Sequence, residues 1–363
     1  MSDTPVLVYA QIGLLGLMVS ALPLSWWWLR QRDADVRARL AALTALTLFL
    51  TFDLIVFGSF TRLTDSGLGC PDWPGCYGAV SPVGAHAEIK AAEAAMPTGP
   101  VTAQKAWIEM VHRYLAMSVG VLILISAVAA WRLQARLPHS PWWATATLAW
   151  VIVQGLFGKY TVTWKLYPAI VTLHLLGGMV LLALLAAQHE SFKHRPLRAA
   201  VSRTAVFVTL AVLMAQVTLG GWVSTNYAVL ACNGFPSCNG QWWPSMDFGH
   251  AFTVRRELGQ TGAGEWLPFD ALVAIHWTHR VFAVVATLAL AWLAARLWRE
   301  PDRSARAYAW LLAGVLLVQW LTGLSNVVLG WPLLAALAHT AGAAALSGLL
   351  VSLALRLNPR ETP

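Results

Sequence analysis

Long apolar stretches restrict this chain to one class of fold. A helix needs roughly 20 consecutive apolar residues to cross the hydrocarbon core of a bilayer. The sequence offers nine such stretches, at about 6–29, 40–62, 107–131, 141–160, 167–189, 203–226, 270–297, 307–327 and 332–356. Of its 363 residues, 58% are hydrophobic and only 12% are charged, which is too little charge to cover a soluble protein of this size. The sequence therefore predicts an all-α polytopic protein embedded in the lipid bilayer.

The formal net charge of +8 follows the connections between these stretches. Arginines and lysines gather after the first, third, fifth and seventh stretches and at the C-terminus: Arg30, Arg32, Arg37, Arg39, Arg132, Arg136, Lys193, Arg195, Arg198, Arg203, Arg296, Arg299, Arg303, Arg306, Arg356 and Arg360. By the positive-inside rule these segments are cytoplasmic, so the N-terminus lies outside and the C-terminus in the cytoplasm. No basic segment precedes the first stretch, which favours a retained helix over a signal peptide. The charge thus indicates topology, and we expect no nucleic-acid partner.

The two long outer loops indicate an internal duplication. GSFTRLTDSGLGCPDWPGCYG starts at Gly58, and GGWVSTNYAVLACNGFPSCNG starts at Gly220. Each loop has a cysteine twelve residues after that glycine and a second cysteine six residues further on. We therefore predict two pseudo-symmetric four-helix bundles, at 40–200 and 201–363. An extra transmembrane helix and a cytoplasmic linker precede them at 1–39.

Four histidines occupy equivalent positions in the two halves. His112 in MVHRYLA matches His279 in WTHRVFA, and His174 and His339 each follow a glutamine by twenty residues. All four lie about five to nine residues into stretches that enter from outside, roughly 7–14 Å below the outer helix ends. Ionisable residues at this depth are costly and usually functional. One pair per half at matching depth favours bis-imidazole ligation of a haem near the outer face.

Other metals fit this pattern less well. Zinc needs three or four close ligands, and each half has two such histidines. His276 is a further candidate, three residues before His279, and Glu109 takes the equivalent place in the first half. Glu109 is either a solvated acid at a helix start or a proton-handling group beside a reacting haem. Arg113 and Arg280 follow the ligand histidines and either bind haem propionates or extend to the membrane interface.

The four cysteines form two outer-loop pairs, Cys70–Cys76 and Cys232–Cys238. A six-residue spacing can close a short disulfide, and an oxidising outer compartment permits it. Both a structural bridge and a redox relay fit this spacing, so the role of the pairs stays open.

Asp53 is a lone acid in the second apolar stretch, with Ala215 as its counterpart in the other half. We expect its side chain to be buried. It then either bonds a neighbouring helix or belongs to a proton path.

The chain resembles the haem A synthase family over about residues 40–356. The resemblance rests on TRLTDSGLGC at 61–70, the ExxHR motif at Glu109–Arg113, His174, the HxxHR motif at His276–Arg280, and His339. It implies an enzyme of the bacterial cell inner membrane, an oxidoreductase made of two four-helix halves. Such enzymes oxidise a ring methyl group of haem O to a formyl group and so supply haem A for terminal oxidase assembly. The extra stretch at 6–29 departs from the family's usual eight spans.

The same resemblance implies that the two halves bind different haems. His112 and His174 would ligate the substrate, haem O, whereas His279 and His339 would ligate a resident haem b that transfers electrons. Glu109 matches the catalytically important acid of the family, and the cysteine pairs match outer-loop disulfides of many bacterial members. The implied partners are haem O synthase and a membrane electron donor of unknown identity.

Two other functions use the same residues. A di-haem b electron-transfer cytochrome would need the four histidines but gives no reason for the difference between Glu109 and His276. A haem transporter or chaperone often carries a Trp-rich outer motif, to which QWWPSMD at 241–247 bears a superficial likeness.

Overall fold

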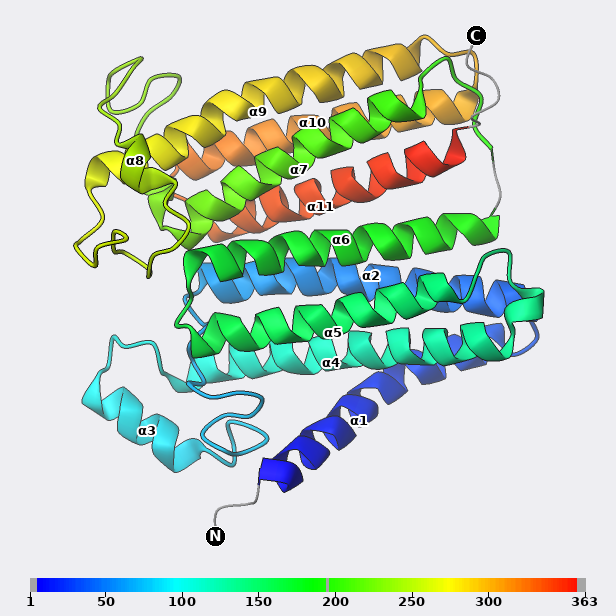
Figure 1. Ribbon diagram of the computed structural model, residues 1–363, viewed down its shortest axis with the longest axis horizontal. Helices are drawn as coiled ribbons and strands as arrows, with labels where there is room; N and C mark the ends of the chain where they lie inside the picture. The colour runs from blue at the N-terminus through cyan, green and yellow to red at the C-terminus, as the bar shows by residue number, and fades with distance from the viewer. Residues whose placement is uncertain (1–4, 194–195, 358–363) are drawn as a thin grey trace. The chain divides into compact units, whose positions relative to one another are not determined.

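The computed structural model describes residues 5–193 and 196–357, and the long elements of this part of the chain are all α-helices joined by loops (Figure 1). Arg195 and Arg360, counted above in the cytoplasmic charge, lie outside the described residues. The helices are α1 (Pro5–Gln31), α2 (Val36–Leu63), α3 (His86–Ala95), α4 (Ala103–Arg132), α5 (Trp142–Thr163), α6 (Pro168–Lys193), α7 (Arg203–Thr225), α8 (Phe248–Ala251), α9 (Phe269–Trp298), α10 (Arg303–Val328) and α11 (Leu333–Arg356). Two short 3₁₀ turns lie at Gln134–Arg136 and Ala228–Leu230.

Each of the nine predicted apolar stretches forms a long helix. Within the described residues, eight of these helices are long and apolar enough to cross a membrane: α1 from Ala10, α2, α4, α6, α7, α9, α10 and α11. The ninth, α5, has 22 residues but is less apolar because it contains several Trp and Thr residues together with Gln154 and Lys159. The chain is thus an all-helical protein that spans the membrane several times, as the sequence predicts.

Polar side chains mark where several of the long helices begin. The carboxylates of Asp35 and Asp302 accept hydrogen bonds from backbone N–H groups in the first turns of α2 and α10. The hydroxyls of Thr102 and Ser202 do the same for α4 and α7. These side chains satisfy N–H groups that have no partner within the helix, which stabilises the helix start by about 1 kcal/mol each.

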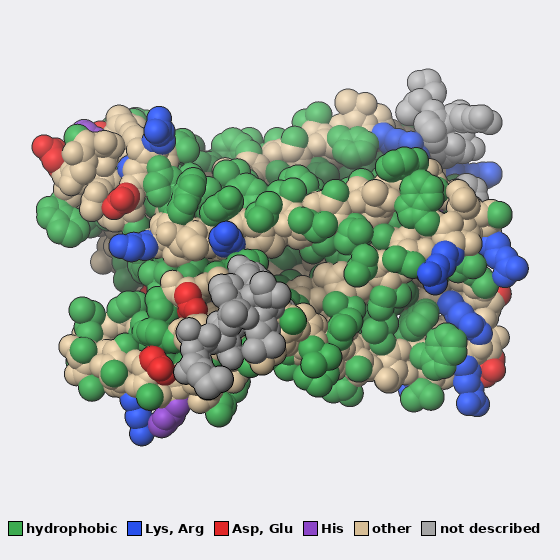
Figure 2. All heavy atoms as spheres, turned by 60° about the horizontal axis from the view of Figure 1, so that its bottom comes forward, with side chains coloured by type: hydrophobic (Ala, Val, Ile, Leu, Met, Phe, Trp, Pro, Cys, Tyr) green, Lys and Arg blue, Asp and Glu red, His purple; other side chains and the backbone are tan. Residues whose placement is uncertain are grey.

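Basic residues mark the other end of the helices that are predicted to run inward. Five of these helices carry a basic residue in the last turn: Arg30 in α1, Arg132 in α4, Lys193 in α6, Arg296 in α9 and Arg356 in α11. Figure 2 shows hydrophobic side chains along the flanks of the helices, with Lys and Arg mostly towards helix ends. The topology in which those ends are cytoplasmic stays a prediction from the sequence.

The chain divides into two compact units. The first comprises Met1–Leu166 and Ser191–Lys193, and the second Tyr167–Glu190 and His194–Pro363. In the first unit α4 packs against α1, α2 and α5. In the second, α7, α9, α10 and α11 contact one another in a closed ring, so that each helix touches two neighbours.

Helix α6 belongs to the second unit for nearly all its length, although the repeat assigns it to the first half at 40–200. Its Thr172 hydroxyl lies 3.2 Å from that of Thr225 on α7. Near its other end, Glu190 accepts a 2.7 Å hydrogen bond from the hydroxyl of Ser352 on α11. The repeat and the packing therefore divide the chain at different points, and the two bundles predicted from the repeat stay a prediction.

The outer loops pack onto the helices that follow them. In the first unit the Cys70–Cys76 loop and α3 form one apolar cluster with Ala106 and Met110 of α4. In the second unit the Cys232–Cys238 loop packs against Val273 of α9. Each loop also contains a cis peptide bond before a proline, at Trp73–Pro74 and Phe235–Pro236. The duplication read from the sequence thus extends to the conformation of the loops.

A buried arginine organises the rest of the second outer loop. Arg256 is only 3% exposed, and its Nη2 donates a 2.5 Å hydrogen bond to the side-chain oxygen of Asn226. Its guanidinium also lies 5.5 Å from the centre of the Trp222 ring. Burial lowers the pKa of the Arg256 guanidinium from its ordinary value. Nothing in the sequence around Arg256 indicates that it is buried.

Asp53 does not have the predicted environment. Its side chain is exposed on α2, on the same stripe as Phe49 four residues earlier, which is also exposed. The expectation that it is buried was wrong because apolar neighbours in sequence do not determine which face of a helix packs. The buried residues of α2, such as Thr47, Thr51 and Ile55, lie on the opposite side.

Gly69 offers a direct test of how the first outer loop packs. A Cβ atom at this position would lie 2.4 Å from the main-chain carbon of Lys105 and 2.6 Å from the nitrogen of Ala106. We expect Gly69→Ala to displace the loop from α4 and to destabilise the protein by about 1–3 kcal/mol. Gly120→Ala is the control, because a Cβ there meets no atom within 4 Å. The thermal unfolding midpoint in detergent should fall for Gly69→Ala alone, and equal midpoints would contradict the packing described here.

Candidate functional site

Glu109 is a buried acid held between α4 and the first disulfide loop. Its side chain is 4% exposed. One carboxylate oxygen accepts a 2.8 Å hydrogen bond from the backbone N–H of Cys70, and the other accepts a 2.5 Å bond from Nη2 of Arg113. The alternative of a solvated acid at a helix start is therefore excluded. A carboxylate held this way has a fixed position and a defined charge partner.

Arg113 holds the disulfide loop through main-chain oxygens. Its Nη1 donates to the carbonyls of Asp72 (2.9 Å), Pro74 (3.2 Å) and Gly75, and its Nη2 also reaches the carbonyl of Cys70 at 3.4 Å. These carbonyls belong to the loop that the Cys70–Cys76 bond closes, with an S–S distance of 2.08 Å. The donors that would bind a haem propionate are thus turned towards this loop.

The second half repeats the arrangement with a histidine in place of the acid. His276, 3% exposed, has Nδ1 3.0 Å from the carbonyl of Ala228, and its Nε2 accepts a 3.1 Å bond from Nε of Arg280. Arg280 donates from Nη1 to the carbonyls of Gly234 (2.8 Å) and Ser237 (3.2 Å), and from Nη2 to that of Cys232. The Cys232–Cys238 bond closes this loop, as predicted.

The contacts of His276 leave it little capacity to bind a metal. A carbonyl can only accept, so Nδ1 of His276 carries the proton and donates to Ala228. Its Nε2 lone pair is then used by Arg280. Both ring nitrogens therefore have protein partners, and the geometry favours a structural role for His276 over iron ligation.

Glycines lie directly against the predicted ligand histidines. A Cβ built on Gly58 of α2 would lie 3.0 Å from Nε2 of His112, and one on Gly220 of α7 would lie 3.0 Å from Cε1 of His279. Gly58 and Gly220 are the two glycines that begin the repeated segments. Any larger residue at these positions would press on the imidazole, so glycine keeps space beside each ring.

His112 also has an aromatic neighbour on α2. The ring of Phe57 stacks on its imidazole, with centroids 6.2 Å apart and planes 8° from parallel. This contact fixes the orientation of the His112 ring from one side, within the first unit.

The second unit contains its predicted histidine pair within the ring of four helices. His279 lies on α9 and His339 on α11, near enough to interact electrostatically. The Gln216 amide nitrogen is 3.1 Å from Nδ1 of His279, and the Thr322 hydroxyl is 3.0 Å from Nδ1 of His339. The sequence reading missed these two partners, because neither residue belongs to a motif.

The residues present suit a haem better than a bare metal ion. Among the described residues, no group of three or more His, Cys, Asp or Glu side chains is placed to hold a metal ion. A haem needs two axial imidazoles and flat space between them. The imidazoles of His279 and His339 lie against Gly220 and Gly323, since a Cβ on Gly323 would lie 3.2 Å from Cε1 of His339. The second unit thus holds two imidazoles within one ring of helices, and their joint ligation of a haem stays a prediction.

The first predicted pair is divided between the two units. His112 belongs to the first unit, and His174 to the second. Within the second unit, Nδ1 of His174 is buried and has no hydrogen-bond partner. Joint ligation of one haem by His112 and His174 stays a prediction from the repeat.

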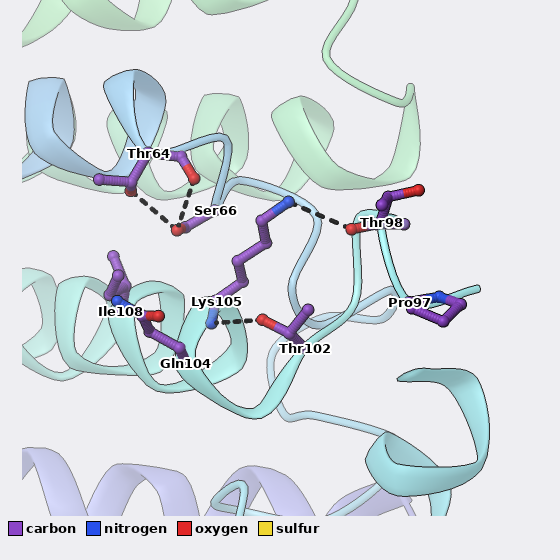
Figure 3. A pocket seen from close by; sticks show the side chains of 9 residues that line it. Thr64, Ser66, Pro97, Thr98, Thr102, Gln104, Lys105 and Ile108 are labelled. Atoms are coloured by element: carbon purple, nitrogen blue, oxygen red, sulfur yellow. Dashed lines mark hydrogen bonds between the residues drawn. The ribbon is translucent and has the colours of Figure 1, made fainter. Parts of the chain in front are cut away.

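A small pocket lies beside the loop that follows α2 in the first unit, about one turn of α4 before Glu109. It has a volume of about 250 Å³ and is lined by Thr64, Ser66, Pro97, Thr98, Gly99, Thr102, Gln104, Lys105 and Ile108. Figure 3 shows the Lys105 ammonium lying across it, with Nζ 3.1 Å from the carbonyl of Gly99. The hydroxyls of Thr64 and Ser66 are 2.8 Å apart. Two residues of the TRLTDSGLGC motif thus line a polar pocket.

Comparison with known proteins places most of the chain in one family. Residues 41–351 match the COX15-CtaA family model, described as "Cytochrome oxidase assembly protein". A protein named "Heme A synthase" from Shewanella oneidensis is 38% identical over 87% of this chain and 96% of its own length. Proteins of the same name from Shouchella clausii and Halalkalibacterium halodurans are 31% and 29% identical, over 69% and 79% of this chain and 81% and 86% of their own lengths.

The family model covers nearly all of the repeated region, including the four predicted ligand histidines, Glu109 and both disulfide loops. On this ground the chain belongs to the COX15-CtaA family of cytochrome oxidase assembly proteins.

Proposed function

We propose that this protein is a haem A synthase, which oxidises a ring methyl group of haem O to the formyl group of haem A. The observation that carries the proposal is the buried Glu109, three residues before His112, where the second half has His276. Relatives that bear the name "Heme A synthase" support it over most of the chain. The product would then serve the assembly of terminal oxidases, in keeping with the family description.

The two histidine pairs serve different haems in this proposal. His112 and His174 hold the substrate, haem O, and His279 and His339 hold a resident haem b. Haem b supplies reversible one-electron transfer when it is bound. The two histidines that α9 and α11 bring into one ring of helices support a haem in the second half, and the repeat extends the assignment to the first.

Glu109 handles charge or protons at the carbon that reacts. The methyl carbon is oxidised twice, first to an alcohol and then to a hydrated aldehyde, which loses water to leave the formyl group. With water as the source of oxygen, each oxidation releases two protons and passes two electrons to a membrane acceptor, and a fixed carboxylate can accept one of these protons or stabilise the positive charge that develops. The hydrogen bonds from Cys70 and Arg113 hold Glu109 in one orientation for this purpose.

The proposal also implies a cellular location and a topology. It would lie in the bacterial inner membrane with the haem sites towards the outer face, the N-terminus outside and the C-terminus in the cytoplasm. Haem O is hydrophobic, so direct transfer from haem O synthase within the bilayer avoids passage through water. A membrane electron donor or acceptor completes the reaction.

The alternatives explain less of the site. A di-haem b electron-transfer cytochrome would use the same histidines but has no need for a buried acid beside one of them. A haem transporter or chaperone has no need for a second, permanently held haem.

The haems that the protein carries distinguish these functions. We expect extracts of the purified protein, co-expressed with a haem O source, to contain haem b, haem A and the alcohol intermediate by mass spectrometry. Two equivalents of haem b, with neither haem O nor haem A, would favour the electron-transfer cytochrome. Haem that leaves unmodified would favour the transporter.

The role of Glu109 is tested by Glu109→Gln. The amide oxygen can still accept from Cys70, but it cannot take a proton from the substrate, so haem A formation should slow by about 10²- to 10⁴-fold. Visible spectra should show unchanged haem binding. Glu88→Gln in α3, an exposed acid of the same outer loop, is the matched control and should form haem A normally. Wild-type activity in Glu109→Gln with haem bound would exclude this role.

A further inference from the structure

The contacts of Thr322 define the protonation of His339. The Thr322 oxygen lies 2.7 Å from the carbonyl of Val318 and 3.0 Å from Nδ1 of His339. A hydroxyl has one hydrogen to donate, and a carbonyl can only accept. The short contact with Val318 therefore uses the hydroxyl hydrogen, which leaves the Thr322 oxygen to accept from His339. Nδ1 of His339 then carries the proton.

This tautomer prepares His339 for iron. A neutral imidazole with its proton on Nδ1 has its lone pair on Nε2, the nitrogen available to a metal. A hydrogen bond from Nδ1–H also fixes the rotation of the ring and makes the other nitrogen more basic. Gly323, one residue after Thr322, packs against the same ring, since a Cβ there would lie 3.2 Å from Cε1 of His339.

The first half lacks this support. His174 and His339 are separated by 165 residues, as are Gln154 and Gln319, so Phe157 occupies the position that corresponds to Thr322. A phenyl ring cannot accept a hydrogen bond from Nδ1 as a hydroxyl does. In agreement, the buried Nδ1 of His174 has no hydrogen-bond partner, whereas that of His339 has one.

The side chain next to His279 also differs between the halves in sequence. Gln216 on α7, whose amide nitrogen lies 3.1 Å from Nδ1 and 3.4 Å from Nε2 of His279, comes four residues before Gly220. The residue four before Gly58 is Leu54, which has no polar group. The positions of Thr322 and Gln216 are thus occupied by apolar residues in the first half.

We propose that Thr322 is a positioning residue that strengthens the bond between His339 and the iron of the resident haem, and that the unsupported His174 is a weaker, exchangeable ligand. The proposal rests on the division of haems proposed above. It explains how one chain retains one haem and releases another. A resident haem needs firm ligation, whereas a substrate haem has to leave once it becomes product.

The test compares three variants of the protein purified with its haems. Thr322→Val removes the hydroxyl at nearly constant volume, Thr322→Ser keeps it, and Ser325→Ala removes a hydroxyl of the same helix that bonds only within α10. The readouts are the rate of haem b transfer to apomyoglobin, the midpoint potential of haem b and its low-spin electron paramagnetic resonance signals.

We expect Thr322→Val to lose haem b about 10- to 100-fold faster, the usual effect of removing a partner of a metal-bound histidine. Its midpoint potential should rise, because a less basic imidazole stabilises ferric iron less. Thr322→Ser and Ser325→Ala should behave as wild type. If Thr322→Val matches wild type in all three readouts, or Thr322→Ser fails to restore them, the proposal is overturned.

A His339→Ala variant separates this failure from failure of the proposed function. Loss of the bis-histidine signals in His339→Ala confirms that His339 is a ligand, so an unaltered Thr322→Val then counts against the role of Thr322 alone. Unaltered signals in His339→Ala would instead contradict the assignment of haem b to this half, and with it the present inference.

Discussion

The cost of placing imidazoles inside a membrane dominates this structure. A polar ring in the hydrocarbon region needs neighbours that fix it. His112, His279 and His339 each lie against a glycine, the His112 ring also stacks on Phe57, and His279 and His339 have hydrogen-bond partners in Gln216 and Thr322. Iron ligation requires neutral imidazoles, and the proposed haem chemistry depends on rings positioned in this way.

The outer loops depend on the same helices. Arg113 and Arg280 each lie one residue after a predicted ligand histidine and donate several hydrogen bonds to a loop closed by a disulfide. The disulfides therefore stabilise the surroundings of these histidines, not only the loops. In the first half the same arginine also holds Glu109, so loop, acid and ligand helix form one connected element.

The sequence alone predicted the helices and the disulfide pairs, because apolar length and cysteine spacing are direct signals; the two repeated halves and the four ligand histidines stay predictions. It did not predict that Arg113 and Arg280 turn to the loops, since a motif identifies a residue without the direction of its side chain. It also misplaced Asp53, whose exposure depends on which face of α2 packs. Thr322 and Gln216 carry no motif, and only their distances to His339 and His279 reveal them. The grouping of α6 with the second unit likewise depends on contacts such as that between Glu190 and Ser352.

The central claim is that the two halves are alike in fold and unequal in chemistry. The most direct test replaces each ligand histidine with alanine in cells that supply haem O, and identifies by mass the haems that each purified variant retains. We expect the His112 and His174 variants to keep haem b and to contain neither haem O nor haem A. The His279 and His339 variants should lose haem b and still bind haem O without converting it. Loss of the same haem from variants of both halves, or haem A in the His112 variant, would contradict the account.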